Sequence, residues 1–320
     1  MTIRRLTITD MTPVTGIVYY EPSADAILDG LDGKIHIPIG SMPIPLLAED
    51  HSALGASSPG YDAVGRGIYQ LLRANPDAVG SSNYANLLQQ AYPHYLSELA
   101  SHIVMLDQKD VEVTYLDRKI NYLKIFALIE PENAQFPFEI GKTLLDKGMR
   151  LSALHLSTIS LYRAVDFLEK ARQFDPKHMP AQNTLGEVYY LLGKYDKALS
   201  CWSGIISELD KVEAEKLEAR LKKIEAGEFP RIPVVDYLEA VAVAMSLFEA
   251  GQYEESAAIY QDIIDDAAFC QQFPLPELYY YLALCCKNMA MPKYAEEYLQ
   301  EALAINPAYD EARAALDQLY

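Results

Sequence analysis

The feature that most limits the fold of this chain is an internal repeat of paired helical segments. From Met179 to Asp210, apolar residues recur with helical spacing on both sides of a turn at 193–195. Gly186 and Ala198 are small and stand in the middle of the two segments, where a longer side chain would push crossing helices apart. The bulky residues that would fill the groove beside them are Leu185, Tyr189 and Trp202. The pattern predicts two antiparallel helices that cross closely.

The same pattern occurs twice more toward the C-terminus. A clear copy begins at Pro276 and closes with Asn306 and Pro307, because a proline ends the second helix. Another copy begins at Tyr237 and keeps the pattern of large and small residues without the closing proline. The matching positions are Tyr279, Leu282, Ala283, Cys286, Ala295, Leu299 and Ala302 in the first of these copies, and Val243, Ala244, Leu247, Ser256, Tyr260 and Ile263 in the second.

These copies resemble tetratricopeptide repeat (TPR) units, whose period is about 34 residues. The family places a large, a small and an aromatic residue on the first helix, then alanine, an aromatic residue and alanine on the second. Ile205 departs from the last of these positions. The resemblance implies an all-α fold, a TPR-type α-solenoid in which helix hairpins stack as a right-handed superhelix.

The TPR-like helical domain is predicted to span residues 84–320. Its repeats are expected near 100–133, 134–178, 179–212, 237–270 and 276–309, with a cap helix at 310–320. In the repeat at 134–178 the two helical patterns lie roughly eleven residues too far apart. The segment from Met149 to Thr158 must therefore lengthen a helix or the turn. The repeat near 100–133 is the weakest, because polar Asp107 and Lys119 stand where small residues are expected.

A charged segment from Ser207 to Pro230 interrupts the repeats. It is rich in helix-forming residues and carries opposite charges four positions apart, as in Lys211/Glu215 and Glu218/Lys222. We expect the second helix of the preceding repeat to continue through it for several turns. A thin apolar stripe runs along this helix, formed by Leu209, Val212, Leu217, Leu221 and Ile224. The stripe either packs on the next repeat or docks a partner helix or a second copy of the chain.

Residues 1–83 do not follow the repeat and are predicted to form an irregular region rich in Pro, Gly and Ser. Short β-type runs occur at 16–20 and 34–39, and a helical pattern appears at 61–75. The stretch 37–47 is apolar, but its three prolines exclude a helix or a central strand. We expect this Pro-rich arm to be extended and to lie in a groove.

Composition argues against several classes of partner. The formal net charge is −18, and no compact Lys/Arg cluster is evident, so nucleic acid and anionic membrane surfaces would be repelled. No apolar run reaches the roughly 18 residues that cross a membrane, and no apolar leader follows Arg4 and Arg5. Four cysteines lack the C-x-x-C spacing of metal or redox sites. We predict a cytoplasmic protein with free thiols.

No catalytic or metal-binding constellation stands out, so we predict no enzyme activity and no cofactor. The segment from Gly60 to Gly67 has the glycine spacing of a phosphate-binding loop, but Arg66 replaces the lysine and no Ser or Thr follows. A loop that runs into a helix is the favoured interpretation. The histidines are scattered without metal-ligand spacing, and adjacent Cys285 and Cys286 fit the role of small buried hydrophobes.

The resemblance implies a protein-interaction adaptor or scaffold that holds a partner polypeptide segment in a concave groove lined by the first helices. The alternatives are a structural subunit that uses the acidic outer face and the long charged helix, and an enzyme with its chemistry in residues 1–83. The groove positions that follow from the family are Asn183, Glu187, Tyr190, Leu238, Val241, Met245, Phe248, Glu277, Tyr280, Leu284 and Lys287. They are mainly apolar, and the first three include no cation, which excludes a clamp for a terminal carboxylate. An open apolar groove is usually occupied, by a partner, by self-association or by the arm at 37–47.

Overall fold

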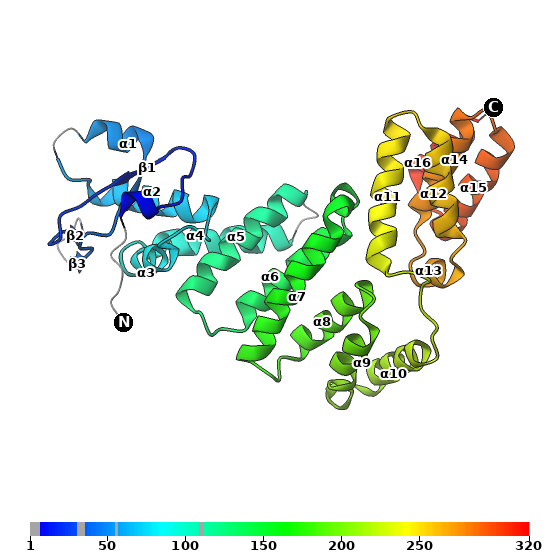
Figure 1. The fold of residues 1–320 in the computed structure, drawn as a ribbon, viewed down its shortest axis with the longest axis horizontal. Coiled ribbons are helices and arrows are strands. Elements are labelled where there is room, and N and C mark those ends of the chain that lie inside the picture. Colours follow the sequence, from blue (N-terminus) through cyan, green and yellow to red (C-terminus); the bar gives the residue numbers. More distant parts are fainter. Residues whose placement is uncertain (1–6, 31–35, 55–56, 109–111, 320) are drawn as a thin grey trace. The chain divides into compact units, whose positions relative to one another are not determined.

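The computed structural model describes residues 7–30, 36–54, 57–108 and 112–319, and it is largely helical (Figure 1). Lys34 and Ile35 of a predicted β-run and Tyr320 of the predicted cap helix lie outside the described residues. Contacts divide the chain into two compact units, residues 1–143 and 144–320. We call them the N-terminal unit and the C-terminal unit and describe each by itself.

Short strands occur only in the N-terminal unit of the described chain, which confirms the predicted fold class of helices with a partly extended N-terminal region. The elements of this unit are η1 Ile8–Asp10, β1 Ile17–Tyr20, β2 Ile27–Asp29, β3 His36–Pro38, β4 Ile44–Leu47, α1 Ala48–Ala53, α2 Tyr61–Ala74, α3 Ser81–Ala91, α4 Pro93–Asp107 and α5 Val113–Ile129, followed by α6 Gln135–Met149. The C-terminal unit continues with η2 Leu151–Leu156, α7 Ser157–Phe174, α8 Met179–Leu191, α9 Tyr195–Ser203, η3 Ile206–Glu208, α10 Lys211–Glu225, α11 Val234–Glu249, α12 Tyr253–Ile264, α13 Ala267–Gln272, α14 Pro276–Asn288, α15 Pro292–Ile305 and α16 Asp310–Asp317.

The strands form two small antiparallel sheets. Strand β1 pairs with β4, so that Ile17 stands opposite Leu47, and β2 pairs with β3, so that Ile27 stands opposite Pro38. Each described sheet has two strands, and every strand in it is an edge strand. Edge strands tolerate proline because one side of the backbone needs no ladder hydrogen bond. This explains how the Pro-rich arm is extended and still takes part in pairing.

Strand β4 lies directly on helix α2, and the helix has a glycine at the contact. A Cβ atom on Gly67 would stand 2.0 Å from the carbonyl oxygen of Pro45, so no larger residue fits there. A Cβ atom on Gly65 would meet the Tyr92 ring at 2.5 Å. The helix begins directly after Gly60. Of the glycines that resembled a phosphate-binding loop, Gly65 and Gly67 therefore lie inside a helix, where they allow close packing.

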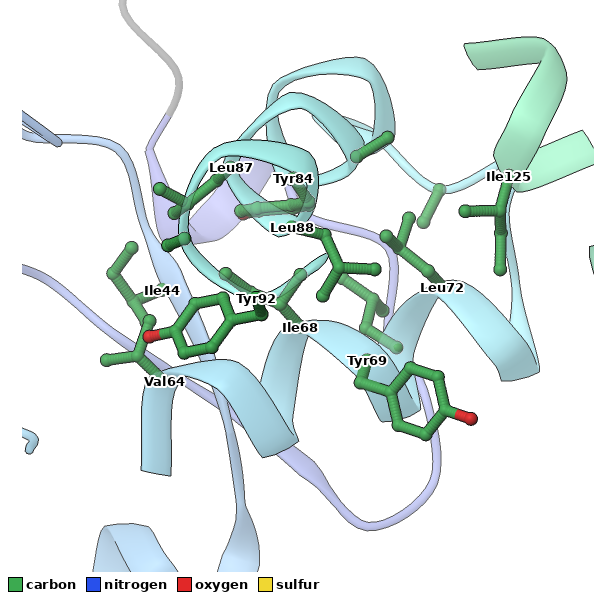
Figure 2. Close-up of a cluster of buried hydrophobic side chains, with 14 of the residues drawn as sticks. Ile44, Val64, Ile68, Tyr69, Leu72, Tyr84, Leu87, Leu88, Tyr92 and Ile125 are labelled. Atoms are coloured by element: carbon green, nitrogen blue, oxygen red, sulfur yellow. The ribbon is translucent and has the colours of Figure 1, made fainter. Parts of the chain in front are cut away.

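The hydrophobic core of the N-terminal unit joins the arm to helices α2 to α5 (Figure 2). Ile44 and Leu46 have no exposed surface, and the hydroxyl of Tyr84 donates to the carbonyl oxygen of Pro43 at 2.5 Å. The arm is thus part of this core, and its apolar side chains are not free to occupy a groove of the repeats, which corrects that expectation. Core residues come from both sides of residue 83, and the contacts divide the chain at 143/144.

Asp107 and Lys119, the polar residues that depart from the repeat pattern near 100–133, form an ion pair in the structure. Lys119 of α5 is only 7% exposed, and its ammonium contacts the carboxylate of Asp107 at the end of α4. A buried ammonium is tolerated when it is paired. The two residues that depart from the repeat pattern therefore compensate each other.

The close helix crossings predicted for the C-terminal unit are present. In the α8/α9 hairpin, Ala198 is fully buried, and a Cβ atom on Gly186 would meet the indole of Trp202 at 2.5 Å. In the α14/α15 hairpin, Ala283 and Ala302 are buried where the helices pack together. The register of these two repeats is confirmed.

The two segments that depart from the repeat, 149–158 and 207–230, each contain a separate helical element. The extra residues before α7 fold as the 3-10 helix η2 and so lengthen the turn. The expectation that the second helix continues through the charged segment is wrong, because α9 ends at Ser203. A separate helix, α10, begins after Asp210, whose carboxylate accepts hydrogen bonds from the amides of Val212 and Glu213, both at 2.9 Å.

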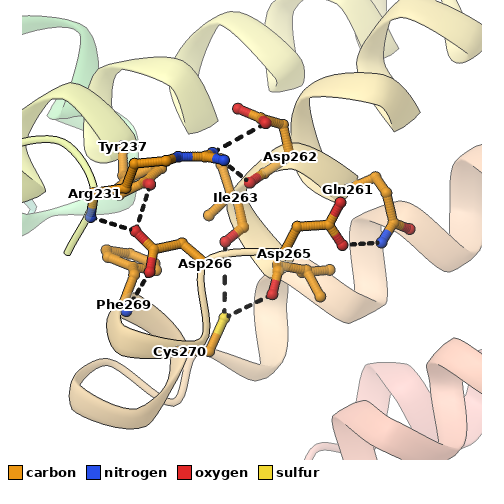
Figure 3. A network of polar contacts seen from close by, with 10 residues as sticks. Arg231, Tyr237, Gln261, Asp262, Ile263, Asp265, Asp266, Phe269 and Cys270 are labelled. Carbon is orange, nitrogen blue, oxygen red and sulfur yellow. Dashed lines mark hydrogen bonds and ion pairs between the residues drawn. The ribbon is translucent and has the colours of Figure 1, made fainter.

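A buried carboxylate connects α11 to the start of α13 (Figure 3). Asp266 is 8% exposed and accepts hydrogen bonds from the Tyr237 hydroxyl at 2.7 Å, from the Arg231 amide at 2.6 Å and from the Ala268 amide at 3.0 Å. Burial alone would raise the pKa of this carboxyl, but the hydrogen bonds to its charged form outweigh burial and lower the pKa.

Substituting Ala302→Glu should destabilise the C-terminal repeat by about 3 kcal/mol or more, because it places a charge at a closed helix crossing. The matched control is Ala304→Glu, on the exposed side of the same helix. Thermal unfolding followed by circular dichroism should show a lower midpoint for the first variant alone. Equal midpoints for the two variants would contradict the register.

Replacing Asp266 by Asn should lower stability at neutral pH by about 1 to 2 kcal/mol. The pKa of Asp266 is lowered on folding from an ordinary value of 3.8, so its contribution is present above that pH and is lost as pH falls through the folded pKa. Urea unfolding between about pH 7 and about pH 2 should therefore show the gap from the wild type closing on acidification. Asp265→Asn, at the exposed neighbour, is the control, and a gap that stays constant with pH would rule the mechanism out.

Candidate partner-binding surface

The groove positions predicted on α8 are engaged by side chains of the chain itself. The indole N–H of Trp202 donates to the Asn183 side-chain oxygen at 3.1 Å. The guanidinium of Arg220 forms a two-point ion pair with Glu187. Tyr190 is 1% exposed. Tyr190 is therefore covered, whereas Asn183 is exposed and Glu187 is half-buried.

Arg220 of α10 provides the cover. Its guanidinium carbon lies 4.3 Å from the centre of the Trp202 ring and 4.7 Å from the centre of the Tyr190 ring. Cation–π contacts and the ion pair with Glu187 act on the same side chain. Helix α10 is thereby attached to the hairpin that precedes it, which favours packing as the role of its apolar stripe. Within the stripe Leu221 and Ile224 are buried, whereas Val212 is 60% exposed.

Helix α10 also borders a cleft of about 410 Å³. Its lining residues are Tyr190, Lys216, Ala219, Arg220, Lys223, Ile224, Glu228, Gln272 and Phe273. The three cations stand four and three positions apart, so they share one face of the helix. No compact Lys/Arg cluster was expected, and the structure corrects this; the one acidic residue between these cations, Glu218, projects from another face of α10.

Helix α11 buries the face that was predicted to line the groove. Leu238 and Val241 are 5% and 4% exposed, whereas Val243, predicted to be core, is 52% exposed. The physical reason is that α11 packs against η2 and α7. The carboxylate of Glu239 accepts a hydrogen bond at 2.9 Å from the amide of Thr158, a first-turn donor of α7 that has no partner within its own helix. Leu238 and Val241 are interior residues in the structure and do not line an open groove.

A continuous row of aromatic rings runs across the remaining groove positions. The ring centroids of Phe248 and Tyr281 are 6.2 Å apart, those of Tyr281 and Tyr280 5.3 Å, and those of Tyr280 and Tyr309 5.2 Å. We call these four residues the aromatic row; all four are half-buried. Tyr281 and Tyr309 were missed as site residues, although three successive tyrosines on one helix cannot all face the core.

The other predicted positions lie on the same two helices as the row. Met245 of α11 and Glu277 and Leu284 of α14 are half-buried, and Lys287 is exposed. The structure therefore gathers predicted positions from α11 and α14 beside the aromatic row.

Carboxylates border the aromatic row. Burial raises the pKa of Tyr281, and the negative charges of Glu249, Glu277 and Glu311 raise it further. Among the described residues none of these three carboxylates forms an ion pair. From residue 234 to residue 319, acidic residues outnumber Lys and Arg by 15 to 3. The row is thus an apolar surface in a strongly negative environment.

Two other kinds of site are absent from the described ranges. No group of three or more His, Cys, Asp or Glu side chains there is placed to hold a metal ion, and no helix there is long and apolar enough to cross a membrane. The thiol of buried Cys285 donates to the Ser256 hydroxyl at 3.4 Å. Burial raises the pKa of Cys285 and of Cys286, so both stay protonated at neutral pH.

No family model matches the chain, and no curated protein matches it. Solved structures that resemble it include the P58(IPK) TPR domain, with 15% identity over 81% of this chain and a TM-score of 0.33. The match spans 64% of that domain. YrrB, described as a TPR protein with an unusual peptide-binding site, is 18% identical over 79% of this chain and 99% of its own, with a TM-score of 0.25. TTC0263, a thermophilic TPR protein of Thermus thermophilus, is 16% identical over 84% of this chain and 93% of its own, with a TM-score of 0.26.

The geometry of the chain itself supports the TPR resemblance. The crossings at Gly186 and at Ala302 have the small residues, the closeness and the spacing of TPR hairpins. The C-terminal unit contains closely crossed helix hairpins.

Arg220→Ala should detach α10 from its hairpin and lower stability by about 1 to 2 kcal/mol, because it removes the cation–π contacts and leaves Glu187 unpaired. Trp202 is the only tryptophan of the chain and is fully buried, so its fluorescence emission should move to longer wavelength. Lys222→Ala, at an exposed position of α10, is the control. Unchanged emission in the Arg220 variant would show that α10 is held by other contacts.

Proposed function

We propose that this chain is a protein-interaction scaffold that holds a polypeptide segment of a partner on the aromatic row and the apolar residues beside it. The observation that carries the proposal is the continuity of the row. Its rings come from α11, from α14 and from the residue before α16, so the row runs from α11 over α14 to the start of α16. A segment laid across them would contact each repeat in turn.

The chemistry of these side chains suits protein recognition. Tyrosine contributes apolar area together with a polar hydroxyl, and it loses little rotamer entropy when bound. Met245 and Leu284 add adaptable apolar contacts next to the rings. A surface of this kind that stays partly exposed is typical of an interaction site.

A structural subunit of a larger assembly is the second candidate, and exposed apolar residues elsewhere favour it. Ile159 and Tyr162 on α7 are 58% and 46% exposed, and Val212 on α10 is 60% exposed. Crosslinking mass spectrometry on cell lysate distinguishes the two candidates. A scaffold gives crosslinks to the partner around α11 and α14, whereas an assembly subunit gives them around α7 and α10.

The double variant Met245→Glu with Tyr280→Glu tests the scaffold. It should abolish partner capture in a pull-down, because two more carboxylates enter an apolar and already negative surface. Helicity by circular dichroism should be retained, since both positions are only half-buried.

The matched control places the same charges elsewhere in the same repeats. Val243→Glu with Tyr294→Glu changes an exposed residue of α11 and an exposed residue of α15, each 52% exposed. This control should capture the same proteins as the wild type. If the Met245/Tyr280 variant also captures them, the row is not the binding surface, and the α10 cleft becomes the better candidate.

A further inference from the structure

We propose that the segment held on the aromatic row is basic, with Arg or Lys side chains among its apolar ones. The inference rests on the proposed function and names the chemistry of the partner. It is carried by three observations: ring faces that lack a cation, carboxylates that lack an ion-pair partner, and the charge of the surrounding helices.

The first observation is that several aromatic rings elsewhere in the chain have a cation over them. The Arg73 guanidinium carbon lies 5.0 Å from the Tyr69 ring centre and 5.6 Å from that of Tyr122, and Arg220 covers two further rings. In the described structure no Lys or Arg is positioned over a ring of the aromatic row. A ring face attracts a cation through its quadrupole, more strongly when the site is shielded from water. A partner would have to supply the cation here.

The second observation concerns Glu249, Glu277 and Glu311. All three are close enough to Tyr281, an inner ring of the row, to raise its pKa, and they come from three different helices, α11, α14 and α16. A segment that covers the row would shield these carboxylates from water. Removing a carboxylate from water without a partner is unfavourable, whereas an Arg or Lys beside it would compensate.

The third observation is the segregation of charge along the chain. The stretch from residue 234 to residue 319, which contains α11 to α16, holds 3 basic and 15 acidic residues, whereas a basic cluster lies on α10. This field would repel an acidic segment and would speed the approach of a basic one. A purely apolar segment would bury the rings but leave the three carboxylates uncompensated.

Fluorescence anisotropy with labelled peptides of equal length tests the inference on the full chain. The probes are peptides in which leucine alternates with arginine, with serine or with glutamate. The arginine peptide should bind at least about tenfold more tightly than the serine peptide, and the glutamate peptide should bind weakest. The preference should shrink as salt concentration rises.

Charge-reversed variants show where the preference arises. The triple variant Glu249→Lys, Glu277→Lys and Glu311→Lys should lose about tenfold in affinity for the arginine peptide. Its control is Glu254→Lys, Glu255→Lys and Glu297→Lys, which makes the same change of net charge on the second helices of these repeats. Both sets remove two acidic residues from first helical turns, so their effects on helix stability are matched. Glu→Gln at the three row positions is the milder variant should the lysines unfold the repeat, and it should weaken binding in the same direction.

The outcomes separate the inference from the proposed function. If serine and arginine peptides bind equally, and Tyr280→Ala weakens both, the row binds polypeptides but the basic preference is overturned. If both triple variants lose affinity equally, the preference reflects net charge and not the row, which also overturns the inference.

If Tyr280→Ala leaves binding of every peptide unchanged, the row is not the site and both proposals fail. A light-scattering mass twice that of the chain, lost in the row variants, would identify the occupant as a second copy and overturn the basic segment.

Discussion

The packing of α11 on η2 and α7 is the constraint on which the open surface of the C-terminal unit depends. Glu239 satisfies the amide of Thr158 at the start of α7, and Leu238 and Val241 are buried on the same helix. A helix has one apolar face to bury, so this contact determines which residues remain outside. Only the end of α11, with Met245 and Phe248, is left to join α14 in a shared surface.

The two interruptions of the repeat make this arrangement possible. The insertion before α7 folds as η2, which provides part of the surface on which α11 packs. The second interruption forms α10, which is capped by Asp210 and attached by Arg220 to the α8/α9 hairpin. Each interruption is thus a structural element with a defined contact. Departures from a repeat are informative because a regular array has no need of them.

Electrostatics divides the C-terminal unit into regions with different chemistry. On α10, Lys216, Arg220 and Lys223 border a cleft, with Arg220 already paired to Glu187. On the described part of the last repeats, carboxylates lie near aromatic rings over which no Lys or Arg is positioned. The net charge of −18 describes neither region, because it averages over both. Recognition depends on the local groups that a partner would touch.

The sequence alone determined the helical hairpins and their register. Gly186, Ala198 and Ala302 stand where helices cross. A close crossing excludes large side chains, so small residues recur at these positions in the repeats. Tertiary structure decided which faces are covered. Leu238 and Val241 have the apolar character of groove residues and of core residues alike, and only the contact with η2 makes them core. The arm at 37–47 became part of a core for a similar reason, since Gly67 of α2 lets the backbone of Pro45 approach. The local sequence shows where two helices must pack closely, because small residues are needed there. Which side chains are buried depends instead on contacts with segments far away in the chain, and no single segment determines those contacts.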